Sequence, residues 1–112
     1  MATALLPCTI PSGQSTSNAI TVATGAVVGL MMPLAWDGAA IVTLEISLDS
    51  GTTWGTLFKP DGTIFGAPVV PGSVLLFDAP QMNLSCQLRI RSGHLSKPVA
   101  QKANRDFKFI TV

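Results

Sequence analysis

Residues 41–54 read IVTLEISLDSGTTW, an alternating run that leads directly into a turn. Apolar and polar side chains alternate from Val42 to Leu48, which is the period of a strand with one buried face. Asp49, followed two positions later by a glycine, is a turn signal. The stretch therefore predicts a β-hairpin whose first strand places Leu44 and Ile46 in the core.

The turn also fits the Asp-box pattern S-x-D-x-G-x-T-W, which is known from sialidase-like propellers. The pattern residues are Ser47, Asp49, Gly51, Thr53 and Trp54. We expect Asp49 to accept backbone N–H bonds, Gly51 to adopt a positive φ and Trp54 to pack under the loop. A propeller carries one box per blade, and this chain is too short for three blades. We therefore expect a structural hairpin, with a glycan or ligand contact as the alternative.

Further alternating or apolar runs lie on both sides of this hairpin. Strands are expected at residues 4–10, 19–22, 26–32, 40–48, 53–58, 73–76, 86–92 and 106–112. Turn signals separate them at residues 11–13, 49–51, 60–62, 71–72 and 92–93. No helix is predicted beyond a single turn near residues 34–36.

This spacing predicts an all-β fold, an antiparallel β-sandwich of jelly-roll or immunoglobulin-like type with about seven or eight short strands. We expect one domain over residues 1–112, in which residues 1–18 are a candidate N-terminal arm and polar loop. The predicted core comprises Leu44, Ile46, Trp54, Leu88, Ile90, Phe107 and Phe109.

The composition is unusually poor in charge. Only 12% of the 112 residues are charged, against about 25% in ordinary globular domains, and the net charge is +1. Residues 19–36 form an apolar stretch, but threonine, glycine and proline interrupt it and no Lys or Arg flanks it. It is interpreted as two short strands, and no contact with a membrane is expected. A small β domain with so little charge favours an assembly in which neighbours cover part of its surface.

Few residues suit catalysis or metal binding. Cys8 and Cys86 are expected to be free thiols, although a disulfide between them stays open. His94, the only histidine, is expected to face solvent in a loop, and one histidine with two cysteines does not make a zinc site. Asp49 and Asp61 are turn residues first and calcium ligands only as a distant alternative. We expect no enzyme activity, no metal and no cofactor.

Six of the seven basic side chains lie within residues 89–108. They are Arg89, Arg91, Lys97, Lys102, Arg105 and Lys108. One interpretation is a solvated face with an edge strand guarded by Lys108, and the other is contact with an acidic partner surface. Nucleic-acid binding is not expected, because no aromatic residues interleave with the basic ones to stack on bases.

Four segments together carry a family resemblance: GLMMPLAW at 29–36, VTLEISLDSGTTW at 42–54, LFKPDGT at 57–63, and LRIRSG with PVAQ at 88–101. Their order resembles small virion-associated proteins of tailed bacteriophages, over about residues 20–111. The resemblance implies a capsid decoration (cement) protein that binds the major capsid protein or other virion proteins. It also implies a homotrimer that is part of the virion and assembles in the cytoplasm of the host bacterium. The alternative is a head-fibre, neck or tail component with a lectin-like role in binding host glycans.

The resemblance transfers no functional residue, so the candidate interface comes from the residues themselves. An uncharged N-terminal arm could add to the sheet edge of a neighbour, and the basic segment could face the shell. The candidate interface residues are Leu5, Leu6, Ile10, Arg89, Arg91, Lys102 and Arg105.

Overall fold

The computed structural model describes residues 3–22, 26–38, 41–59, 61–77 and 86–112. Within these residues the chain forms ten strands and no helix, which confirms the predicted all-β fold. The strands are β1 (Ala4–Ile10), β2 (Ile20–Val22), β3 (Val27–Met31), β4 (Ile41–Ser47), β5 (Gly55–Thr56), β6 (Gly66–Pro68), β7 (Val74–Leu76), β8 (Cys86–His94), β9 (Lys97–Pro98) and β10 (Arg105–Thr111).

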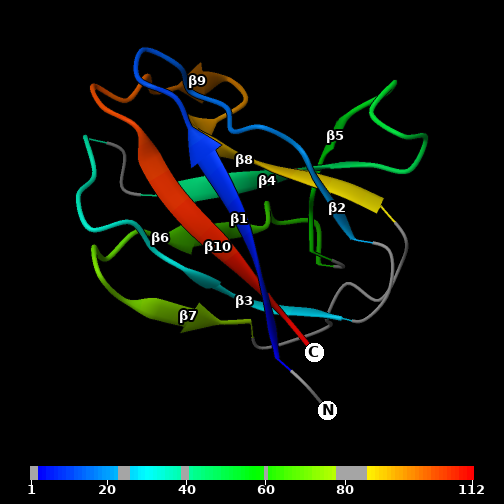
Figure 1. Cartoon of the computed structure of the whole chain (residues 1–112). Coiled ribbons are helices and arrows are strands. Elements are labelled where there is room, and N and C mark those ends of the chain that lie inside the picture. Colours follow the sequence, from blue (N-terminus) through cyan, green and yellow to red (C-terminus); the bar gives the residue numbers. More distant parts are fainter. Residues whose placement is uncertain (1–2, 23–25, 39–40, 60, 78–85) are drawn as a thin grey trace.

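The strands form two antiparallel sheets. One sheet has the order β1-β10-β3-β7, and the other has the order β2-β8-β4-β5, with β6 also paired to β4. The first strand thus pairs with the last, β2 with β8, β3 with β7, and β4 with β5 and β6. This nesting is that of one long hairpin rolled up, which is the jelly-roll order rather than the immunoglobulin order. In Figure 1 the blue β1 and the red β10 lie side by side across the front of the molecule.

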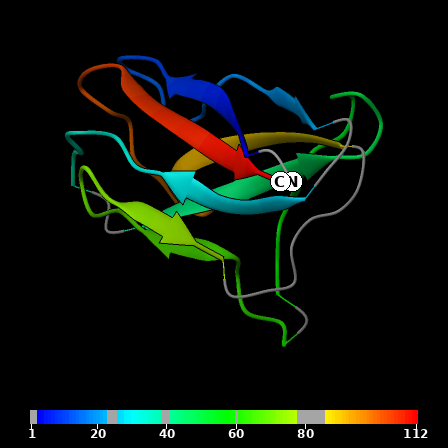
Figure 2. The ribbon, with the colours of Figure 1, turned by 60° about the horizontal axis from the view of Figure 1, so that its bottom comes forward.

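The two sheets pack face to face over a shared core. Figure 2 shows β3 and β10 of one sheet lying in front of β4 and β8 of the other. Five of the predicted core residues are buried to at least 98%: Leu44, Leu88, Ile90, Phe107 and Phe109. Ile46 is partly buried against this core. Trp54 lies outside it, because its ring stacks on the guanidinium of Arg89 on the outer side of β8.

Some predicted boundaries differ from the structure. The strand predicted at residues 53–58 contracts to β5, and the very short β6 and β9 were not predicted. The predicted turn at residues 92–93 is instead the end of β8, which continues to His94. Gly93 there has a φ of 83°, and β9 folds back on it. No helical turn forms at residues 34–36, and the turn between β2 and β3 lies outside the described residues.

Residues 4–10 are not a free arm. They form β1, which pairs with β10 along its whole length and places Cys8 and Ile10 in the core. The polar segment after β1 is also held in place, since Ser17 N–H donates to Ile90 O and Ser92 N–H donates to Ser15 O. No helix within the described residues is long and apolar enough to cross a membrane.

Candidate functional site

The outer face of the β1-β10-β3-β7 sheet is apolar and uncovered by the described residues. The strand register places Leu5, Ile110, Gly29 and Leu76 in one row across all four strands. The next row of the same face holds Pro7, Lys108, Met31 and Val74. Leu5, Val74 and Leu76 are 45%, 55% and 67% exposed. We call this surface the apolar face and define it by Leu5, Pro7, Met31, Val74, Leu76 and Ile110.

Gly29 makes the first row of the apolar face continuous. A Cβ at this position would lie 2.6 Å from Leu75 O, 3.0 Å from Leu76 Cδ2 and 3.3 Å from Ile110 Cδ1. Because a contact of 2.6 Å with a backbone oxygen is too short, only glycine lets β7 approach β3 so closely. The side chains of Leu76 and Ile110 consequently approach each other over Gly29 and form a ridge.

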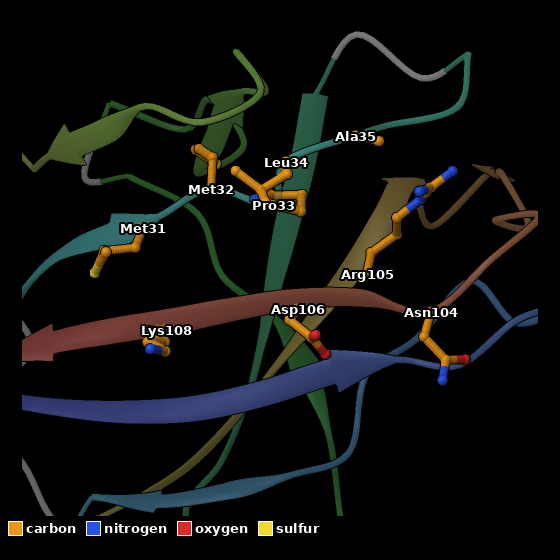
Figure 3. A pocket seen from close by; sticks show the side chains of 9 residues that line it. All are labelled: Met31, Met32, Pro33, Leu34, Ala35, Asn104, Arg105, Asp106 and Lys108. Atoms are coloured by element: carbon orange, nitrogen blue, oxygen red, sulfur yellow. The ribbon is translucent and has the colours of Figure 1, made fainter.

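An open groove of about 370 Å³ adjoins the apolar face, between β10 and the segment that follows β3. Figure 3 shows it from close by, with Asn104, Arg105, Asp106 and Lys108 on the side of β10. The segment at residues 31–35 forms the other side. Its Leu34 is 90% exposed, the largest exposure among the described large apolar side chains.

Two opposite charges stand on the same outer side of β10. Asp106 is exposed and accepts a hydrogen bond of 2.7 Å from Thr9 Oγ1. Lys108 is exposed and forms no ion pair with any described residue. The apolar face therefore carries, next to its groove, one cation and one anion that are both accessible to a partner.

Arg105 also lines the groove, and its guanidinium joins a partly buried polar network. Its Nη2 donates to Asp37 Oδ2 over 2.7 Å, and its Nε donates to Gln101 Oε1 over 3.1 Å. Gln101 is 1% exposed and also donates to Ser92 Oγ and to Asp37 O. The Lys102 backbone N–H and the Arg105 guanidinium lower the pKa of Asp37. This network fixes the loop at residue 37 to β8 and β10, so its charges are neutralised within the chain.

The outer face of the second sheet is polar and internally paired. Glu45, which is 5% exposed, accepts from Arg89 Nε over 2.8 Å and forms an ion pair with Arg91 Nη2. Arg89 in turn lies 4.1 Å above the centre of the Trp54 ring. The Arg91 side chain is only 8% exposed and is therefore inaccessible to a partner.

The Asp-box residues meet in the loop between β4 and β5. Thr53 N–H and Ser47 Oγ both donate to Asp49 Oδ1 over 2.8 Å, and Gly51 N–H donates to Ser47 Oγ over 2.8 Å. These bonds, first that from Thr53, lower the pKa of Asp49 to about 2. Gly51 has a φ of 89°. Every one of these bonds closes within the loop, so the arrangement is that of a rigid turn.

The candidate nucleophiles and ligands do not converge. Cys8 and Cys86 are free thiols buried in the core, and burial raises the pKa of Cys8 to about 12. His94 is exposed at the end of β8. Among the described residues, no three His, Cys, Asp or Glu side chains gather as a metal site would require.

The interface residues expected from the sequence do not form one surface. Leu5 is exposed on the apolar face and Leu6 is half-buried against the core, but Ile10 is fully buried and belongs to no surface. Arg91 and Arg105 are paired internally, Arg89 stacks on Trp54, and Lys102 is exposed in the loop before β10.

Sequence reasoning missed all of the apolar face except Leu5, namely Pro7, Met31, Val74, Leu76 and Ile110. One signal for it was present. Residues 74–76 read VLL without alternation, although a short edge strand with one solvated face should alternate.

Comparison with known proteins identifies no relative of this chain: no family model matches it, and no curated protein or solved structure is significantly similar.

Proposed function

We propose that this chain is a non-enzymatic structural protein of a tailed-bacteriophage particle, a capsid decoration protein that binds the shell of major capsid protein. The observation that carries the proposal is the apolar face. It lies on a sheet whose strands are paired and whose inner side is fully occupied by the core. An apolar surface on a fully formed sandwich favours contact with another protein.

The low charge of the chain supports the same proposal. Of the three ion pairs among the described residues, all lie within the chain and two are centred on the buried Glu45. Asp106 and Lys108 are the accessible charges on the apolar face, so covering it desolvates few charges, which favours packing against a neighbour. The jelly-roll order also occurs in viral capsid domains, although a fold by itself does not define a function.

The lectin-like alternative has less support. Sugar binding of this kind uses exposed aromatic rings, and among the described residues Phe58 is the one large exposed aromatic side chain, at 56%. Arg89 lies over one face of the Trp54 ring, and Trp36 packs edge-on against Phe107 at 5.5 Å.

Quantitative mass spectrometry of purified particles of the phage that encodes this chain tests the proposal. A decoration protein is expected in constant proportion to the major capsid protein. A few copies per particle would instead indicate a neck or tail component, and absence from the particles would refute the proposal.

A further inference from the structure

We infer that the apolar face binds a second copy of this chain in a two-fold, face-to-face pair. The inference deepens the proposed function and rests on it, because it names the neighbour that covers the apolar face on the particle, a second copy of the chain, and leaves contact with the shell to the other surfaces of the chain. It follows from the arrangement along β10, where a groove, two opposite charges and an apolar ridge follow one another.

The charges supply the first part of the self-complementarity. Asp106 and Lys108 stand on either side of the inward-facing Phe107. The two-fold axis lies in the plane of contact, runs perpendicular to β10 and passes at the level of Phe107. Rotation about it places β10 of the second copy face to face with β10 of the first, in the antiparallel direction. Each Lys108 then lies opposite Asp106 of the other copy. Packed sheets are about 10 Å apart, a distance that the long lysine side chain and the carboxylate together can span.

The ridge and the groove supply the second part. Ile110, which forms the ridge with Leu76, lies as far beyond Phe107 along the chain as Asn104 lies before it. Asn104 lines the groove beside the exposed Leu34. The same axis therefore places the ridge of each copy over the groove of the other. Because the contact is isologous, each copy contributes the same surface, and the ridge of each copy meets the groove of the other at the same time.

The size of the surface sets the expected affinity. Strands about 4.8 Å apart with a rise of about 3.4 Å per residue give this sheet a face of roughly 400 Å². Specific stable interfaces bury roughly 800 Å² per partner. We therefore expect a weak, reversible pair in dilute solution that many simultaneous contacts strengthen on a particle.

Sedimentation of the purified full-length chain over a range of concentrations tests the inference by charge reversal. The wild type is expected to shift reversibly from monomer to dimer. Lys108→Asp or Asp106→Lys alone sets like charges opposite each other and should weaken the pair about tenfold or more. The double variant restores both cross-pairs and should regain the wild-type affinity.

The control is Lys97→Asp, which reverses an exposed charge on β9, away from the apolar face, and should leave the affinity unchanged. Circular dichroism and thermal melting verify that each variant is folded, as expected for exposed positions. A wild-type chain that stays monomeric, a trimer, or a double variant that is not rescued would each overturn the inference.

The inference and the proposed function fail in different ways. If the wild type is monomeric but Leu76→Asp removes the chain from particles, the face binds another virion protein, so the inference fails and the function stands. If the chain dimerises as described but is absent from purified particles, the inference stands and the function fails.

Discussion

At the scale of single residues, Glu45 is the buried carboxylate on which two arginines converge. Glu45→Gln leaves both guanidinium groups without their counter-charge in a largely buried place. We expect it to lower the free energy of unfolding by about 3 kcal/mol, measured by urea denaturation. Asp37→Asn, which breaks a more exposed pair with Arg105, should cost clearly less. Equal losses would contradict this account.

The lowered pKa of Asp49 predicts a specific dependence of the protein's stability on pH. The fold lowers its pKa from 3.8 to about 2, so the folded state favours the ionised form. The resulting stabilisation is fully present above about pH 4 and is lost as the pH falls towards 2. In Asp49→Asn, melting temperature should therefore fall less steeply between pH 4 and pH 2 than in the wild type. Thr52→Ala, which changes the same loop without a titrating group, should keep the wild-type slope.

Substitutions at Gly93 and Gly13 distinguish the free-energy cost of a left-handed backbone from the cost of steric crowding. Both have similar φ values, 83° and 81°. A Cβ at Gly13 would meet nothing within 4 Å, whereas one at Gly93 would lie 2.6 Å from Lys97 O. Gly13→Ala should cost about 1 kcal/mol of unfolding free energy for its left-handed backbone. Gly93→Ala should cost about 3 kcal/mol, because β9 must also move. Similar costs in chemical denaturation would show that β9 does not pack so closely.

At the scale of elements, the open edge of β1 is protected by a proline. Thr9 N–H donates to Asn18 Oδ1 and Thr9 O accepts from Asn18 N–H, so the Thr9 backbone faces away from β10. Because backbone direction alternates along a strand, Pro7 faces the same open edge, where it offers no N–H. This makes addition of β1 to the sheet of a neighbour unfavourable.

Pro7→Val supplies the missing N–H and keeps an apolar side chain on the face. We expect it to produce oligomers larger than a dimer, detected by static light scattering, because the edge can now pair with another strand. Pro11→Thr also adds an N–H, but in the turn after β1, and should leave the size of the oligomers measured by light scattering unchanged. Unchanged scattering from Pro7→Val would mean that the edge is blocked by something else.

The elements were predictable where the side-chain period was clear. β4, β8 and β10 span seven to nine residues and contain alternating runs, such as residues 42–47 and 86–91, and their predicted inward residues Leu44, Leu88 and Phe109 are buried. β5, β6 and β9 span two or three residues, too few to display a period. Their existence depends on pairing with a longer strand, which local sequence does not encode.

At the scale of the whole molecule, the surface was less predictable than the core. The basic segment at residues 89–108 suggested one charged surface, yet Arg91 and Arg105 turn to Glu45 and Asp37, which lie far away in sequence. The apolar face combines residues from four strands, and only the register between β1, β10, β3 and β7 brings them into rows. That register is set only in the completed fold, and the local pattern of one sequence does not reveal it.

The central claim is that the chain assembles through the apolar face and not through the outer face of the other sheet. It is tested most directly by adding purified variants to particles that lack the protein and measuring how much is bound. Leu76→Asp charges an exposed position of the apolar face, and Thr21→Asp charges an exposed position on β2 of the other sheet. The account predicts that Leu76→Asp loses binding while Thr21→Asp binds as the wild type does. Retained binding by a folded Leu76→Asp together with loss by Thr21→Asp would contradict it.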